Sequence, residues 1–84
     1  MNPNRRFKDE IFEQFARIGK AFSSPKRLEL IDILCQGERT VDRLSKETGL
    51  SIANTSQHLQ VLKNARLVEQ EKKGLHVSYR TAPM

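Results

Sequence analysis

A polar segment in the second half of the chain has the residue types that recognise duplex DNA. From Ser51 to Arg66 there is no Asp or Glu, and from Ser51 to Gln60 there is no formal charge. Short hydroxyl and amide side chains hydrogen-bond base edges in a major groove, and a lack of carboxylates avoids repulsion from phosphates. A solvated helix face would mix Glu with Lys, so the segment favours DNA contacts over a merely polar surface. The outward residues are Ala53, Asn54, Ser56, Gln57, His58, Gln60 and Lys63.

Two short helices and a glycine turn would position this segment. Thr40 is a candidate N-cap for a helix over residues 41–48, and Ser51 is one for a helix over residues 52–64. Gly49 between them suits the left-handed conformation that ends a helix. The spacing predicts a helix-turn-helix whose second helix is the recognition helix. The residues expected to face inward are Val41, Leu44 and Thr48, then Ile52, Leu59 and Leu62, with Thr55 or Val61.

Two further helical patterns precede this unit, over residues 4–22 and 25–36. The Ser24-Pro25 pair begins the second of them, because serine caps a helix and proline suits its first position. The expected inward residues of that helix are Leu28, Ile31 and Leu34. Over residues 4–22 an apolar stripe either packs in the core or contacts a second subunit. The predicted dimer contacts in this stripe are Phe7, Ile11, Phe12, Phe15 and Ile18.

Residues 67–80 have the alternation of a β-hairpin. Lys72, Lys73 and Gly74 are the expected tip, where glycine permits a positive φ. The residues expected to share one face of the returning strand are Leu75, Val77 and Tyr79. A basic hairpin after a helix-turn-helix predicts a winged helix-turn-helix, mainly α with a C-terminal β-hairpin. Lys72 and Lys73 are expected to contact phosphate or the minor groove, with a solvated turn as the alternative.

The composition is that of one small domain over residues 1–84. Apolar residues make up 37% of the chain and charged residues 30%, a balance typical of globular proteins with one modest core. No apolar run approaches the ~18 residues of a membrane span, and no signal peptide is evident, so we expect a cytosolic protein. Its single cysteine, Cys35, cannot form an internal disulfide. The net charge of +5 favours an acidic partner such as double-stranded DNA.

Several short motifs occur in a fixed order along the chain. They are Ser24-Pro25-Lys26-Arg27-Leu28, Ile33-Leu34, Thr48-Gly49-Leu50-Ser51, Ser56-Gln57-His58-Leu59-Gln60-Val61-Leu62 and Leu67-Val68. Together they resemble the ArsR/SmtB repressors, dimeric winged-helix regulators of bacteria and archaea, over about residues 12 to 80. The resemblance implies major-groove contacts at Ser51, Ile52, Ala53, Ser56 and Gln57. Many relatives are polar at the positions of Ile52 and Ala53, which would here offer methyl contacts to thymine.

The same resemblance bears on metal and thiol sensing. The family's metal sensors carry a cysteine pair in the helix that matches residues 41–48, and no cysteine lies there. A second metal site of the family uses a C-terminal helix, and the chain ends at Met84, where that helix would begin. We therefore expect no metal and no cofactor, and interpret His58 and His76 as surface or DNA-contacting residues. Cys35 occupies the position of a reactive cysteine in some sensors of the family, but those sensors need a second cysteine, so we favour a small, partly buried helix residue as its interpretation.

Part of the chain also resembles a subgroup in which the winged helix precedes a rhodanese-like sulfurtransferase domain. The similar segments are Glu13 to Lys20, Glu29 to Asp32 and Asn54 to Leu62. This resemblance implies that the chain is the DNA-binding portion of such a protein. The chain itself shows no catalytic arrangement and no phosphate loop, so we predict no enzyme activity.

The sequence therefore predicts a DNA-binding transcriptional regulator, a repressor that dimerises through residues 4–22. Two recognition helices would enter successive major-groove faces of an inverted repeat, and an effector would shift the dimer between geometries. Because only the first of the family's two dimer helices is present, we expect a weak dimer. A winged helix that binds another protein and has no operator of its own is the second hypothesis.

Overall fold

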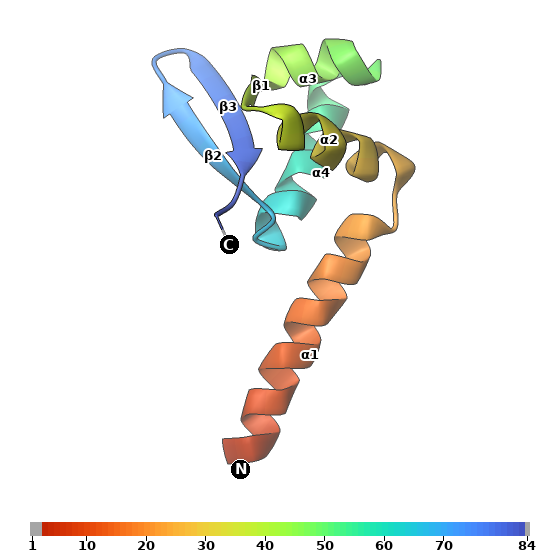
Figure 1. Ribbon diagram of the computed structural model, residues 1–84, viewed down its shortest axis with the longest axis vertical. Coiled ribbons are helices and arrows are strands. Elements are labelled where there is room, and N and C mark those ends of the chain that lie inside the picture. The colour runs from red at the N-terminus through yellow and green to blue at the C-terminus, as the bar shows by residue number, and fades with distance from the viewer. Residues whose placement is uncertain (1–2, 84) are drawn as a thin grey trace.

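The computed structural model describes residues 3–83, and within that range it forms four helices and one small sheet (Figure 1). The helices are α1 (Pro3–Phe22), α2 (Pro25–Gln36), α3 (Val41–Thr48) and α4 (Ile52–Asn64). The strands are β1 (Arg39–Thr40), β2 (Val68–Lys73) and β3 (His76–Thr81), in the antiparallel order β1-β3-β2. The predicted winged helix-turn-helix is confirmed, with helix ends within one residue of the expected ones. Residues 1, 2 and 84 of the predicted domain lie outside the described range.

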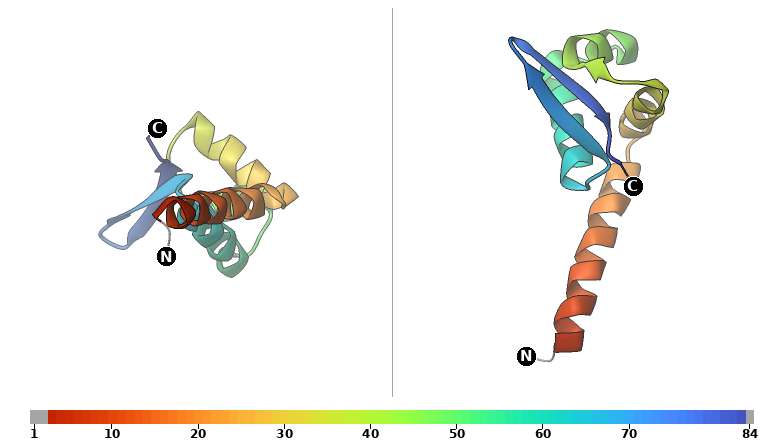
Figure 2. Two further views of the ribbon diagram at one scale, coloured as in Figure 1. Left: turned by 90° about the horizontal axis from the view of Figure 1, so that it is seen from below. Right: turned by 60° about the vertical axis from the view of Figure 1, so that its left-hand side comes forward.

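α1 projects from one end of the domain as a long arm (Figures 1 and 2). Its 20 residues span about 30 Å at 1.5 Å per residue. The Cα radius of gyration is 14.6 Å, whereas a compact domain of this length has about 12 Å. Ala21, at the end of the arm that joins the domain, is the buried residue of α1. Gln14 Nε2 also donates to the Ala65 carbonyl at 3.1 Å, which ties the middle of α1 to the end of α4.

The hydrophobic core lies where α2, α3, α4 and the sheet meet. Its buried members are Ala21, Leu30, Leu34, Leu44, Leu59, Leu62, Ala65, Val68 and Tyr79. Leu28 and Ile52 were expected to face inward, and both are about half exposed. Leu28 is two residues from the buried Leu30, which places it on the other side of α2. Ile52 is in the first turn of α4, which extends beyond the core.

The wing is a hairpin with a two-residue loop. Lys73 pairs with His76, so Gly74 and Leu75 form the tip. Gly74 has φ 61°, and a glycine at the first central position is typical of a type II′ turn. The predicted tip was wrong by one residue, since Lys72 and Lys73 are the last residues of β2.

Two other features of the sheet differ from the predictions. Leu75 is 99% exposed in the turn, so it does not share the inward face of Val77 and Tyr79. The short strand β1 was not predicted, because a two-residue strand has no periodicity to detect. Arg39 of β1 pairs with Tyr79 of β3, which anchors the base of the wing to the start of α3.

The predicted caps explain why α3 and α4 begin and end where they do. Thr40 Oγ1 accepts from the Arg43 amide at 3.2 Å, and Ser51 Oγ accepts from the Asn54 amide at 3.0 Å. Between the helices Gly49 has φ 73°, in the left-handed region. No described atom lies within 4 Å of a Cβ built at Gly49, so the need for glycine there comes from the backbone conformation and not from crowding.

We expect Gly49→Ala to lower the free energy of unfolding by about 1–2 kcal/mol, because a Cβ is disfavoured in the left-handed region. Gly49→Asn should cost less, since asparagine tolerates this conformation. Urea unfolding of both variants at one protein concentration measures the difference. Equal losses for alanine and asparagine would contradict the backbone explanation.

Candidate nucleic-acid interface

The outer side of α4 is the candidate interface. The structure leaves most of the predicted contact residues exposed on one continuous surface: Ser51, Ile52, Ala53, Asn54, Ser56, Gln57, Gln60 and Lys63. The opposite side of the helix is fully buried through Thr55, Leu59 and Leu62. The buried Thr55 hydroxyl donates to the Ser51 carbonyl at 2.8 Å, so its polar atom is satisfied within the helix. α4 therefore has one side held by the core and one side exposed, from which Lys63 Nζ donates to Gln70 Oε1 on β2 at 3.1 Å.

His58 differs from the other predicted contact residues, because it is half-buried at the edge of this surface. Its Nδ1 lies 3.1 Å from Arg27 Nη1. Arginine can only donate, so Nδ1 accepts this hydrogen bond. Among the ring nitrogens only Nε2 then remains for another partner.

Arg27 joins three helices at this point. Its Nε donates to the Ala21 carbonyl at 3.2 Å, and its Nη2 donates to the Lys20 carbonyl at 2.8 Å. These carbonyls belong to the last turn of α1, where carbonyl groups have no amide donors within the helix. Arg27 thus caps α1 from the first turn of α2 while its other nitrogen contacts His58 on α4.

The turn before α4 is held by two side chains from neighbouring helices. Lys26 Nζ donates to the Thr48 carbonyl at 2.8 Å, and the Ser45 hydroxyl donates to the Leu50 carbonyl. Both carbonyls lie in the segment that links α3 to α4. These bonds fix the angle at which α4 leaves the turn, and so they position its outer side.

A cleft of about 400 Å³ separates α4 from the wing. From α4 it is lined by Ile52, Ser56 and Gln60, which follow one another at intervals of four residues. The other lining residues are Thr40, Val41 and Asp42 at the start of α3, and Gln70, Leu75, His76, Val77 and Tyr79 on the hairpin. The α4 surface and the wing therefore face each other across an open, mostly uncharged channel.

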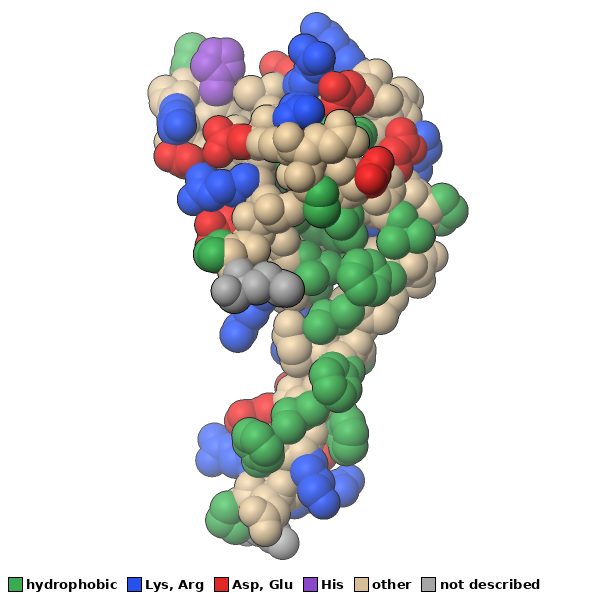
Figure 3. Space-filling view, viewed as in Figure 1, with side chains coloured by type: hydrophobic (Ala, Val, Ile, Leu, Met, Phe, Trp, Pro, Cys, Tyr) green, Lys and Arg blue, Asp and Glu red, His purple; other side chains and the backbone are tan. Residues whose placement is uncertain are grey.

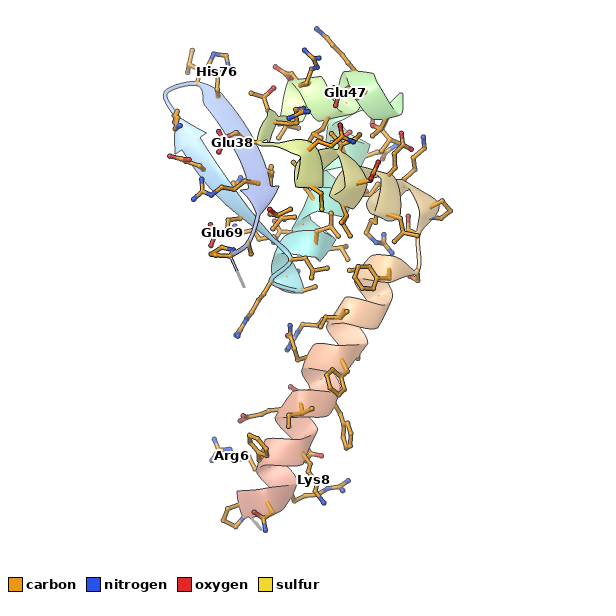
Figure 4. All side chains as sticks on the ribbon, viewed as in Figure 1. Arg6, Lys8, Glu38, Glu47, Glu69 and His76 are labelled. Carbon is orange, nitrogen blue, oxygen red and sulfur yellow. The ribbon has the colours of Figure 1, made fainter. Side chains whose placement is uncertain are left out.

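The charges of the wing are unevenly divided along it (Figure 4). Near its base Arg80 binds three carboxylates, at 2.7 Å from Glu71, 3.2 Å from Glu69 and 3.5 Å from Glu38. The hydrogen bond to Glu71 raises the pKa of the Arg80 guanidinium, and burial raises the pKa of the Tyr79 phenol. Arg80 therefore offsets part of the negative charge of these three carboxylates at the base of the hairpin.

Lys72, Lys73 and His76 are exposed near the outer end of the hairpin, where Figure 4 shows His76. Lys73 Nζ lies 3.8 Å from Glu71 Oε1, a long contact between exposed groups. Such pairs are weak in water. The outer end of the wing thus remains basic.

A hydrophobic stripe runs along α1 from its N-terminal end to α2 (Figure 3). Three of the five predicted dimer residues are exposed and the other two, Ile11 and Ile18, are half-buried; Phe15, for example, is 63% exposed. The exposed large side chains of the stripe on α1 are Phe7, Phe12, Phe15 and Phe22. An exposed patch of this kind is typical of a surface that contacts another macromolecule.

Two further findings concern sites predicted to be absent. Within residues 3–83 no three His, Cys, Asp or Glu side chains gather as metal ligands would, and Cys35 is exposed. No helix in the same range has both the length and the apolar character needed to cross a bilayer.

A helix-turn-helix whose second helix turns a polar side outward beside a short antiparallel hairpin is a winged helix-turn-helix domain. The family model described as "bacterial regulatory protein, arsR family" matches residues 24–70. The match covers more than half of the 84 residues. The chain belongs to this family, as the resemblance of its motifs predicted.

Two relatives are named as regulators. An HTH-type transcriptional regulator of Mycobacterium tuberculosis is 40% identical over 75 residues, which are 89% of this chain and 33% of that protein. The arsenical resistance operon repressor of Bacillus subtilis is 34% identical over 68 residues, 80% of this chain and 65% of that protein. The chain thus spans about a third of the length of the first and about two thirds of the length of the second.

A solved structure is also similar. It is the solution structure of a homodimeric winged helix-turn-helix DNA-binding domain from Mycobacterium bovis, described as a possible ArsR-family transcriptional regulator. It has 39% sequence identity and a TM-score of 0.85, and the match covers 90% of this chain and 70% of that one. The family match and the similarity to this solved domain therefore agree on the fold and the family.

The sequence interpretation did not assign roles to Lys26 and Arg27. A signal for them was present, because cations in the first turn of a helix are opposed by its dipole. The first turn of α2 contains both of them and no acid. Their occurrence there indicates carbonyl partners elsewhere, which the structure identifies as Thr48, Ala21 and Lys20.

We expect Arg27→Gln to lower the free energy of unfolding by about 1–3 kcal/mol, because carbonyls at the end of α1 lose their charged donor. Arg43→Gln is the matched control: Arg43 is exposed and pairs with Glu47 at 3.1 Å, a surface pair worth less than about 1 kcal/mol. Urea unfolding compares the two. Similar losses in both variants would show that Arg27 does not join the helices energetically.

Proposed function

We propose that the chain is the DNA-binding domain of a transcriptional regulator and acts as a dimeric repressor. The observation that carries this proposal is the outer side of α4, which is exposed, uncharged over its first two turns and free of acids. Short polar groups in this arrangement suit base edges in a major groove. Membership of a family of regulatory proteins agrees with this role.

The residues proposed for DNA contact divide by chemistry. Hydroxyl, amide and imidazole groups would carry sequence preference, at Ser51, Asn54, Ser56, Gln57, His58 and Gln60. Methyl groups of Ile52 and Ala53 would contact thymine. Cations at Lys63, Lys72 and Lys73 would contact phosphates and supply affinity without specificity.

The cleft between α4 and the wing supports a geometry for the complex. A helix in the major groove and a hairpin at the neighbouring minor groove would lie on either side of one sugar–phosphate backbone. The cleft of about 400 Å³ provides room for that backbone. In this geometry Ser56 and Gln60 would lie at the boundary between base contacts and backbone contacts.

Selection of bound duplexes from a random pool tests the proposal. A dimeric reader yields an inverted repeat whose half-sites lie about one helical turn apart. Binding to the selected duplex should also weaken steeply with added salt, because released counterions drive the association. An unenriched pool, together with binding that is insensitive to salt, would instead support the second hypothesis of a protein-binding module.

On the selected duplex, we expect Gln57→Ala to weaken binding by about 1–3 kcal/mol and to leave binding to random duplexes nearly unchanged. Gln36→Ala is the matched control, since Gln36 is an exposed glutamine at the end of α2, away from α4. Fluorescence anisotropy on both duplexes measures the two affinities. Equal losses on specific and random DNA would reject a base-reading role for Gln57.

We propose that the hydrophobic stripe of α1 forms the dimer contact, as the homodimeric domain from Mycobacterium bovis suggests. Phe15→Ser should then shift the chain toward monomer without unfolding it, because Phe15 is exposed in the single subunit. Glu13→Ser, at an exposed position on the other side of the same helix, should leave the association unchanged. Sedimentation at protein concentrations up to ~1 mM, the limit of weak specific association, measures the monomer–dimer equilibrium. A strict monomer at that concentration would refute the dimer.

We propose that the regulator acts in the cytoplasm, and that an effector changes its DNA affinity by shifting the dimer between geometries. The rhodanese-like domain stays a prediction. The relative from Mycobacterium tuberculosis, of which the match covers 33%, has room for a further domain.

A further inference from the structure

A basic hollow of about 410 Å³ lies where α1 meets the C-terminal end of α4. Figure 1 shows these two segments side by side, and the hydrogen bond from Gln14 to Ala65 joins them. The lining residues are Arg17, Lys20, Val61, Asn64 and Arg66. Three of these are cations and none is an acid, so the hollow has a positive potential. Neither the packing of the core nor the proposed DNA contacts of α4 explain this charge.

Two of the cations have no counter-charge. Within residues 3–83 the Lys20 ammonium and the Arg66 guanidinium make no hydrogen bond or ion pair. The third cation, Arg17, already has partners within α1. Its guanidinium donates to Gln14 Oε1 at 3.3 Å and lies 3.9 Å from Glu13 Oε2. Cations that line one hollow repel one another, and an anion between them removes this repulsion.

Arg66 is in an unusual backbone conformation. Its φ is 61°, and among residues 3–83 it is the one non-glycine residue with a positive φ. The turn after α4 needs this geometry, because the amides of Arg66 and Leu67 return to the Lys63 and Leu62 carbonyls at 2.9 and 3.1 Å. Glycine or asparagine is the usual residue in such a turn. An arginine here is disfavoured by the backbone, so its side chain needs a separate reason.

We infer that this hollow is a binding site for a phosphoryl oxyanion. Arg66 and Lys20 supply the unpaired charges, and Arg17 and the Asn64 amide supply further donors. Charge-assisted hydrogen bonds from arginine suit the geometry of phosphate oxygens. The anion would bridge α1 to the end of α4, and so it would fix the dimer helix relative to the recognition helix.

The site is separate from the hydrophobic stripe of α1. Arg17 is five residues after Phe12, and Lys20 is five residues after Phe15. A separation of five residues corresponds to about 140° around the helix. The oxyanion can therefore bind in a monomer or in a dimer. Its source is either a free phosphate-bearing molecule or a backbone phosphate of bound DNA, and the experiment below separates the two.

The first arm titrates inorganic phosphate into the full chain without DNA, at constant ionic strength, and follows amide and arginine Nε signals by NMR. Saturable shifts confined to the lining residues are expected, with a dissociation constant on the order of 1 mM. Lys20→Gln should weaken this binding about tenfold, as expected for the loss of one charge-assisted bond. Lys8→Gln is the matched control, because Lys8 is an exposed lysine near the N-terminal end of α1 (Figure 4).

Arg66→Asn is the second test variant, and it should weaken phosphate binding as much as Lys20→Gln does. Asparagine suits a positive φ, so this variant keeps the turn after α4 while it removes the charge. A melting temperature no lower than that of the unsubstituted chain would show that the turn is intact.

The second arm measures duplex affinity in phosphate-free buffer. If the oxyanion is a DNA phosphate, Lys20→Gln weakens specific and random duplexes alike and reduces the salt slope by about one, whereas Lys8→Gln does not. If it is a free phosphate, Lys20→Gln leaves duplex affinity unchanged and abolishes any effect of added phosphate on it. The first arm needs no DNA, so its result stands even if the proposed DNA contacts of α4 are wrong.

The inference is overturned by either of two results. One is the absence of saturable phosphate shifts together with equal duplex affinity for the Lys20 and Lys8 variants. The other is phosphate binding that Lys8→Gln weakens as much as Lys20→Gln, which would indicate general attraction to a basic chain.

Discussion

The division of α4 into a buried side and a free side is the constraint on which the rest of the structure depends. Thr55, Leu59 and Leu62 are fully enclosed, and helical periodicity then forces the residues between them outward. A rotation of α4 about its axis would bury amides and hydroxyls without partners, at a cost of a few kcal/mol for each group. The polar surface therefore faces outward because the core holds the opposite side of the helix.

The orientation of α4 depends on the first turn of α2. Lys26 contacts the turn before α4, and Arg27 contacts both His58 on α4 and the last carbonyls of α1. Two neighbouring cations thus connect the end of α1 to the start and middle of the recognition helix. A change in the direction of α1 would act on α4 at two places, through the contact of Arg27 with His58 and through the hydrogen bond from Gln14 to the Ala65 carbonyl.

Local signals in the sequence predicted the helices, whereas contacts between residues far apart in the sequence were not predicted. The caps Ser24, Thr40 and Ser51 and the turn glycine Gly49 depend on residues within four positions, so their types were sufficient. The contact of Arg27 with His58 joins residues 31 positions apart, and the sequence contains no marker for it. The hairpin tip was misplaced by one residue because both lysines of β2 and Gly74 were compatible with a turn. The outer residues of α4 followed from composition, whereas the half-buried position of His58 required the neighbouring helix.

The arm formed by α1 connects these points. Ion pairs four residues apart, such as Arg5–Asp9 at 3.4 Å, support its helical form, but each such pair contributes only about 0.3–0.5 kcal/mol. An isolated helix of this length is marginal in water, and most of α1 has no packing within residues 3–83. Its stability and direction therefore depend on what covers the hydrophobic stripe. Because Arg27 caps the same helix and contacts His58, a partner that orders α1 also acts on the helix proposed to read DNA. Coupling between assembly and DNA binding then follows from packing alone, without a separate sensor site.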